Sequence, residues 1–394
     1  MLNRFVPAAL LLLGPLAAPA GAMAAGASLQ NFATFAVTNQ TASGYTVSDI
    51  QTAYDVSPLL SSGLDGTGQM IALLEWGGFD RADIADFART NGLADATITE
   101  TYVGGSRFPL ETSTSSRGET TLDLEWAHAM APGAALHVYY LNNNVSDSAG
   151  WREIAQAFTS AANDGARSVS VSFGICSPGS AARPVQTALA SLLTRGVSVF
   201  VASGDSGALA GPRKQCGSKP SVAYPASDPS VIAVGGTSLQ LNNDQSISSE
   251  TAWRLSGGGK ALPFLRPIWQ VAPQLGPGKY RQVPDVAFLA DQNTGVQVYF
   301  RGHRIIAGGT SLGAPAWAGI WSVIEQDAAQ SGKSVAAGPR LVYRVANSSA
   351  YTSAFHDITS GSNGVYHAHP GWDRVTGWGT PDAANLASSL LAIS

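Results

Sequence analysis

The segment GGTSLGAPAWAG, residues 308–319, carries the most information about the fold and chemistry of this chain. It places Ser311 in a glycine-rich turn directly before an apolar stretch, 314–324, which predicts a helix. A serine at a helix N-terminus exposes its hydroxyl, and nearby backbone N–H groups can stabilise an anion. Acyl transfer requires such a nucleophile and such donors together. Ser311 is therefore the candidate nucleophile.

Upstream of this turn, short apolar runs alternate with amphipathic ones, which is typical of a parallel sheet. The expected fold class is α/β, with a mostly parallel central sheet and helices on both faces. Residues 250–285 contain several prolines and few apolar runs, so we expect a long surface excursion there. Strands are expected at 69–75, 136–141, 168–173, 197–202 and 231–234, helices at 81–90, 119–130, 151–162, 185–195 and 383–391, and a hairpin at 296–299 and 304–307.

Composition excludes several classes of protein. The chain has 394 residues, 45% of them hydrophobic and 13% charged, with a net charge of −4. This content allows a large buried core, and the sparse, scattered cations offer no surface for nucleic acid. No apolar run reaches the length of a membrane span. We therefore expect a monomer without nucleic-acid or membrane partners.

The N-terminus predicts a secretory signal peptide over residues 1–24. One basic residue, Arg4, precedes an apolar run that ends in small residues suited to cleavage. Pro15 and Pro19 interrupt the run, which is also too short to span a membrane. Residues 25–43 are expected to form a short segment that is too brief for a folded domain of its own, and one large domain is expected at 44–394. The protein is expected to be secreted, into the medium or a periplasm.

The chain has two cysteines, Cys176 and Cys216. In an exported protein such a pair is typical of a disulfide. A metal site would need more ligands than two isolated cysteines supply. The expected disulfide closes a loop worth about 3–4 kcal/mol in the chain-entropy model.

Carboxylates cluster in a second segment, GETTLD, where Glu119 and Asp123 stand four residues apart. On a helix this spacing puts both carboxylates on one face, about 5–6 Å apart at Cβ. Two carboxylates at this separation can share a proton, so one of them can act as a base. The alternative is a solvated helix start that favours acidic residues. Glu75 and Asp205 each follow an expected strand, where α/β sheets carry their reactive groups.

Four motifs in one order resemble those of a known family. GETTLD, SGDSG, GGTSLGAPAWAG and HPGWD are similar to motifs of the sedolisins, the serine-carboxyl peptidases with a subtilisin-like fold. The resemblance runs from residue 44 to the C-terminus. It implies a serine-type endopeptidase that is active at acidic pH and cleaves polypeptides. The histidine motif of other subtilisin-like peptidases is absent from the sequence.

The resemblance assigns a role to each motif residue. Ser311 would be the nucleophile, Glu119 the general base, and Asp123 the residue that orients the base and shares its proton. Asp205 would donate a hydrogen bond to the oxyanion, which a carboxyl group does only when protonated. Glu75 matches an acidic residue that extends the hydrogen-bonded chain in some members. Phe173 stands where the family often has tryptophan, so this extension is less secure here.

The C-terminal motifs resemble the family's calcium site. One structural Ca²⁺ would be held by oxygen ligands from two loops, since hard cations prefer oxygen. A pair of Asx turns is the alternative explanation. The implied ligands are the carboxylates of Asp357 and Asp373 and the carbonyls of Ile358, His369 and Gly371.

Three other functions remain open at this point. A neutral peptidase or esterase would use a histidine base, for which His128 and His137 are the nearest candidates. A glycosidase could use Glu119 and Asp123 as its carboxyl pair, but Ser311 would then have no role. A calcium-stabilised binding protein could retain the scaffold without activity.

Overall fold

Strand β3 (Met70–Glu75) lies at the centre of the main sheet, and its sequence explains why. All residues after Met70 are buried, because helices cover both faces of the sheet. β3 pairs in parallel with β5 (Ala135–Tyr140) on one side and with β6 (Ser168–Val171) on the other. The strands expected at 69–75 and 136–141 therefore form within one residue of their predicted bounds.

The structure is a computed structural model that describes residues 30–31, 34–36, 44–142, 148–176, 179–211 and 216–393. The predicted signal peptide, residues 1–24, lies outside the described residues, as does most of segment 25–43. Both expectations therefore stay predictions. None of the helices in the described part of the chain has the length and apolar content that a membrane crossing requires.

The main sheet has eight strands in the spatial order β10-β9-β8-β6-β3-β5-β4, and β13 also pairs with β9. The pairings are parallel except that of β10 with β9. This is the expected mostly parallel sheet. The remaining strands are β4 (Ile98–Tyr102), β8 (Ser198–Ala202), β9 (Ile232–Leu241), β10 (Ile247–Ala252) and β13 (Val286–Leu289).

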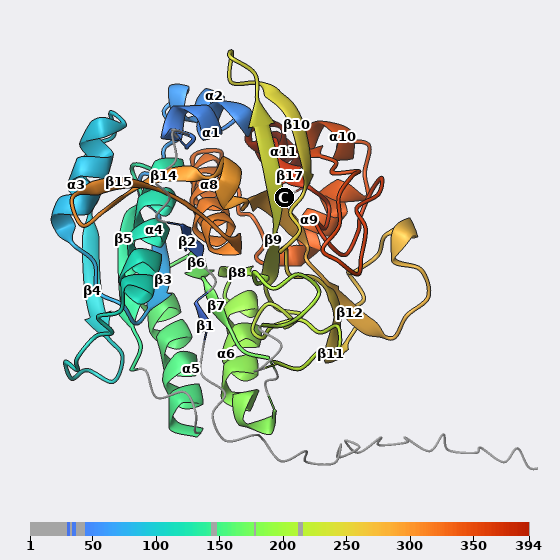
Figure 1. Ribbon diagram of the computed structural model, residues 1–394, viewed down its shortest axis with the longest axis horizontal. Coiled ribbons are helices and arrows are strands. Elements are labelled where there is room, and N and C mark those ends of the chain that lie inside the picture. The colour runs from blue at the N-terminus through green and yellow to red at the C-terminus, as the bar shows by residue number, and fades with distance from the viewer. Residues whose placement is uncertain are drawn as a thin grey trace, which may run out of the picture.

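Helices cover both faces of this sheet, as predicted (Figure 1). On one face, α4 (Thr114–Met130) and α8 (Thr310–Gln330) pack against each other and against the strands. On the other, α5 (Ser148–Asn163) lies against α6 (Arg183–Thr194). Each face has its own hydrophobic cluster, so the core forms two layers.

Two expectations need correction. α4 begins at Thr114, not at 119, because Ser113 caps it by accepting from the N–H of Ser116. Residues 250–285 are not free of regular structure. They hold the end of β10, strand β11 (Gly259–Leu265), a short turn of 3₁₀ helix at 273–275 and strand β12 (Tyr280–Val283).

The remaining elements frame the main sheet. The expected hairpin at 296–299 and 304–307 is confirmed, and it leads into α8. The elements are β1 (Gln30–Asn31), β2 (Thr34–Ala36), α1 (Val47–Ala53), α2 (Ser57–Ser61), α3 (Arg81–Thr90), β7 (Phe173–Gly174), β14 (Val296–Phe300), β15 (His303–Gly308), α9 (Pro339–Ala346), α10 (Tyr351–Ala354), β16 (Phe355–His356), β17 (Thr380–Pro381) and α11 (Ala383–Ala392).

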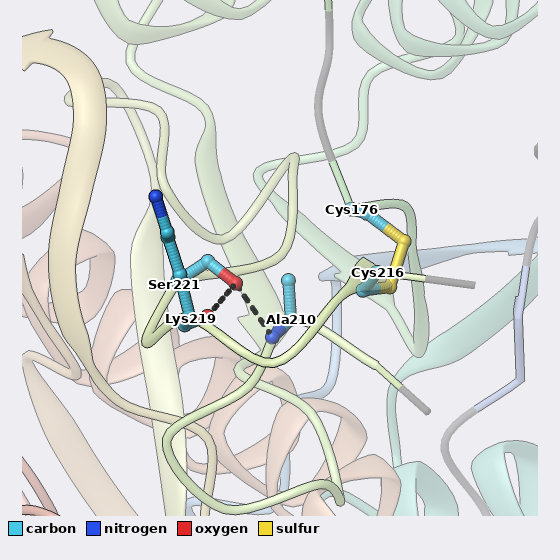
Figure 2. Close-up of a disulfide and its surroundings, with 5 residues drawn as sticks. All are labelled: Cys176, Ala210, Cys216, Lys219 and Ser221. Atoms are coloured by element: carbon cyan, nitrogen blue, oxygen red, sulfur yellow. Dashed lines mark hydrogen bonds between the residues drawn. A yellow bond between two sulfur atoms is a disulfide. The ribbon is translucent and has the colours of Figure 1, made fainter. Parts of the chain in front are cut away.

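The predicted disulfide joins Cys176 to Cys216 (Figure 2). Their Cα atoms lie 5.2 Å apart, within the usual range for a bridge. Beside it, the hydroxyl of Ser221 donates to the carbonyl of Lys219 and accepts from the N–H of Ala210. The disulfide thus fixes the chain two residues beyond β7.

Candidate active site

Helix α4 carries the two predicted carboxylates in its interior. Glu119 and Asp123 are 1% and 0% exposed, because α4 packs against both the sheet and α8. The solvated helix start, which was the alternative explanation, is therefore excluded. Glu125 on the same helix accepts the backbone N–H of Tyr299 at 3.0 Å, so it serves the β14–β15 hairpin.

Asp123 is held by a serine from the sheet. The hydroxyl of Ser172 donates to its Oδ2 at 2.6 Å. Burial raises the pKa of Asp123 well above its usual value, and the charge of Glu75 raises it further, while the bond from Ser172 lowers it. A carboxyl with a strongly raised pKa keeps its proton at acidic pH.

Glu75, at the end of β3, joins the same cluster. The hydroxyl of Thr120 donates to its Oε2 at 3.1 Å. Burial, followed by the charge of Glu119, raises the pKa of Glu75 to about 8, and a hydrogen bond with Asp123 opposes this rise. Three buried carboxyls so close together cannot all ionise, so they titrate as one coupled group.

Ser311 lies in the first turn of α8, after a turn that requires glycine. Gly309 has φ 108° and ψ 162°. At Gly308 an added Cβ would approach the carbonyl oxygen of Ala290 to 2.5 Å. The hydroxyl of Ser311 donates to the carbonyl of Ser172 at 3.4 Å. Ser172 therefore contacts both Ser311 and Asp123.

Asp205 follows β8 and contacts the residue that precedes the nucleophile. Its Oδ1 accepts the backbone N–H of Thr310 at 2.9 Å and the hydroxyl of the same residue at 2.8 Å. That hydroxyl in turn accepts the N–H of Gly204 at 3.0 Å. A turn aspartate that bonded only its own loop would make neither contact with Thr310. The predicted residues Glu119, Asp123, Asp205 and Ser311 thus belong to one hydrogen-bonded and packed region.

A strand edge lies directly beside this cluster. β7 follows Ser172, and β1 pairs with it antiparallel, with Gln30 opposite Gly174 and Asn31 opposite Phe173. Three residues later, β2 pairs with β15, which leads to Ser311. The backbone of the chain itself therefore occupies the edge where an extended peptide would add as a strand.

The two candidate histidines are engaged elsewhere. Nε2 of His128 lies 2.8 Å from the carbonyl oxygen of Ala94. The two ring nitrogens of His137 lie 2.8 Å from the hydroxyl of Thr101 and 3.2 Å from that of Tyr139. Burial lowers the pKa of both rings. None of these contacts joins either histidine to Ser311, Glu119 or Asp123.

The proposed calcium ligands fold into one pair of loops. Oδ2 of Asp357 accepts the N–H of Gly371 at 2.9 Å. Asp373 is 1% exposed, accepts the N–H groups of Val375 and Thr376, and has its pKa raised by burial to about 6. A loop rich in oxygen atoms and holding a buried carboxylate fits a hard cation, whose positive charge would balance the negative charge of the carboxylate. Ile358 and His369 flank the same turn.

Sequence reasoning missed three hydroxyl donors: Ser172 bonds Asp123, Thr120 bonds Glu75, and Thr310 bonds Asp205. Thr120 and Thr310 lie inside the two motifs, next to Glu119 and Ser311, and that adjacency is the signal that could have found them. Ser172 carries no such local signal. Phe173, which replaces the family's usual tryptophan, packs its ring 4.7 Å from that of Trp76, the residue after Glu75.

Comparisons with known proteins identify the family and the fold. The model of the family described as "Subtilase family" matches residues 113–379. Kumamolisin of Bacillus sp. (strain MN-32) is 35% identical over 374 residues, which cover 88% of this chain and 64% of kumamolisin. Sedolisin of Pseudomonas sp. (strain 101) is 32% identical over 381 residues, which cover 89% of this chain and 62% of sedolisin.

A solved structure of Pseudomonas sedolisin, a serine-carboxyl proteinase complexed with pseudo-iodotyrostatin, superposes with a TM-score of 0.77. It is 29% identical, and the match covers 90% of this chain and 99% of that one. The chain spans less than two thirds of the length of the two curated relatives. The protein therefore belongs to the subtilase family, among its sedolisin-like members.

Proposed function

We propose that the protein is a secreted, acid-active serine-carboxyl endopeptidase that cleaves peptide bonds through an acyl-enzyme on Ser311. The observation that carries the proposal is the position of Ser172. Its hydroxyl binds Asp123, its carbonyl accepts from Ser311, and the strand edge that follows takes up an extended chain. Ser172 thus contacts the proposed nucleophile and one carboxyl of the proposed pair, and it directly precedes β7, the strand edge proposed to bind substrate.

In the proposed first step, Oγ of Ser311 attacks the carbonyl carbon of the scissile bond while its proton passes to Glu119. Asp123 lies one helical turn further along α4 and orients the base. Because burial raises the pKa values of Glu75 and Asp123, these two retain protons at acidic pH. The cluster then holds a single negative charge, which leaves Glu119 free to act as the base.

The developing oxyanion would be bound by the backbone N–H of Ser311 and the carboxyl of Asp205. Since Oδ1 of Asp205 already accepts two hydrogen bonds from Thr310, the proton of a neutral carboxyl would lie on Oδ2. This role requires acidic pH. The intermediate then collapses, the C–N bond breaks, and the amine takes the proton from Glu119. Water then attacks the acyl-enzyme while its proton passes to Glu119. The ester bond to Ser311 breaks, Oγ takes the proton back, and the acid product leaves.

The substrate would be an extended polypeptide. It would pair antiparallel with β7, in the manner of Gln30 and Asn31, and main-chain hydrogen bonds would supply much of its affinity. The chemistry needs no organic cofactor. One Ca²⁺ ion would be held by Asp357 and Asp373 with the carbonyls of Ile358, His369 and Gly371. Its role would be to neutralise buried charge and order these loops.

The test is hydrolysis of an unfolded protein across acidic to alkaline pH by the wild type and three variants. Ser311→Ala and Glu119→Gln are expected to lose activity while they stay folded. Ser331→Ala, at the exposed end of the same helix, is the matched control and should keep full activity. Full activity in either of the first two variants would contradict the assignment. A near-neutral optimum lost on substitution of His128 or His137 would favour the histidine alternative.

A further inference from the structure

A projecting arm, residues 254–284, contains β11, β12 and the loop between them (Figure 1). Four large apolar side chains on it face solvent. Ile268 is 96% exposed, and Leu262, Leu265 and Val271 are each more than half exposed. Elsewhere among the described residues, Val365 alone is an exposed large apolar side chain. Apolar surface gathered on one feature in this way marks an interaction site.

The arm is also purely cationic. It carries five Lys and Arg residues, and no Asp or Glu occurs between Glu250 and Asp285, in a chain whose net charge is −4. Arg281 is buried in an ion pair with Asp285, so its charge is neutralised locally. The exposed cations are Arg254, Lys260 and Lys279. The backbone N–H of Arg266 bonds the carbonyl of Lys279, which places a cation beside Leu265.

Internal bonds hold the arm in shape. A guanidinium nitrogen of Arg266 donates to the carbonyl of Gly276 at 2.9 Å, which ties the two limbs together. Gln270 is buried and exchanges two hydrogen bonds with the backbone of Gln282. With Gln270 fixed inward, its neighbours Ile268 and Val271 face outward. The apolar tip is therefore preorganised.

We propose that the arm is a peripheral docking surface for anionic lipid. Its tip projects outward, so a protein partner would need a matching cavity, whereas a lipid surface deforms around inserted side chains. Lysines on the two limbs of the arm, Lys260 at the start of β11 and Lys279 beside Arg266, can reach anionic headgroups while their stems stay in the interface. A second copy is disfavoured at this site, because two arms would repel each other. The proposed contact would be peripheral, because it needs no membrane-spanning segment.

The experiment measures sedimentation of the full chain, carrying Ser311→Ala to prevent self-digestion, with phosphatidylcholine vesicles with or without phosphatidylglycerol. The readout is binding, so it does not depend on the proposed peptidase activity. We expect binding to the anionic vesicles, weakened by salt. Lys260→Gln with Lys279→Gln should weaken it about 25-fold, since each cation near the surface is worth about fivefold.

Ile268→Asp should weaken binding at least about tenfold, because a charge replaces the most exposed apolar side chain. Val365→Asp, an equivalent change outside the arm, is the matched control and should bind like the parent. Thermal unfolding of each variant checks that the fold is kept. Equal loss in both Asp variants, or equal binding to vesicles without phosphatidylglycerol, would overturn the proposal. So would Ile268-dependent self-association in the absence of vesicles.

Discussion

The substitution Ser172→Ala removes one hydroxyl. It should shift the acid limb of the pH–activity profile towards neutral pH. The substitution deletes the 2.6 Å hydrogen bond to Oδ2 of Asp123 but keeps the carbonyl that accepts from Ser311. The bond favours the ionised carboxylate, so its loss raises the pKa of Asp123 further. Glu119 and Asp123 share the proton between them and thus the single negative charge of the cluster, so this first charge forms at a higher pH when Asp123 is less acidic, and Glu119 can act as a base only once it has formed. The variant should therefore need a higher pH for activity.

The size of the shift follows from the bond. A hydrogen bond to a charged group contributes about 1.5–3 kcal/mol, and one pKa unit corresponds to about 1.4 kcal/mol. The apparent pKa of the acid limb of kcat/KM should rise by about 1–2 units. Because the carboxyls are coupled, this value belongs to the cluster and not to Asp123 alone. The assay is hydrolysis of a fluorogenic peptide across the acid range.

A matched control lies two residues earlier. Ser170 is fully buried on β6, and its hydroxyl bonds to no group in the described part of the structure. Ser170→Ala should therefore leave the acid limb in place. If the two variants gave the same profile, or if the limb of Ser172→Ala moved to lower pH, the reasoning about this hydrogen bond would be wrong.

Three further predictions concern stability. Burial raises the pKa of Glu325 from its ordinary value of 4.5 to about 8. Between these two pH values the folded state therefore binds one proton more than the unfolded state. Stability should then fall as pH rises from about 4.5 to 8, by at most about 1.4 kcal/mol per unit, and Glu325→Gln should flatten that slope in urea unfolding. Replacing Cys176 and Cys216 together by Ala should lower the free energy of unfolding by about 4 kcal/mol, and an unchanged urea midpoint would refute this. Chelation should lower the melting temperature of the wild type but not that of Asp373→Asn. If chelation lowered the melting temperature of Asp373→Asn as well, that result would argue against a calcium site at this residue.

Much of the fold was predictable, because its signals are local. The run MIALLE predicts a buried strand, and the periodic apolar positions of 81–90 predict α3, whose bounds match. The start of α4 was placed five residues late, since its cap depends on the hydroxyl of Ser113 and the first turn is not apolar. β13 was missed because a short apolar run between prolines and polar residues gives little periodicity.

The site was predictable as a set of residues but not as an arrangement. Glu119 and Asp123 share a helix, so their spacing alone places them on one face. Ser172 is separated from Asp123 by 49 residues and from Ser311 by 139, and its contacts arise only when β6 and β7 meet α4 and α8. The apolar arm was likewise invisible, because the sequence does not reveal which of its apolar side chains stay outside the core.

The burial of α8 sets how long the nucleophile keeps its position. Eighteen of the 21 residues of this helix are buried, including Ser311 at its start. Opening of so enclosed an element disrupts the core that surrounds it, so its opening free energy approaches that of global unfolding. The amide hydrogens of α8 should therefore exchange with deuterium only on the timescale of global unfolding, whereas those of the arm exchange early. The position of Ser311 is thus as persistent as the fold itself, and any adjustment of the proposed activity without loss of the fold must come from the loops around it.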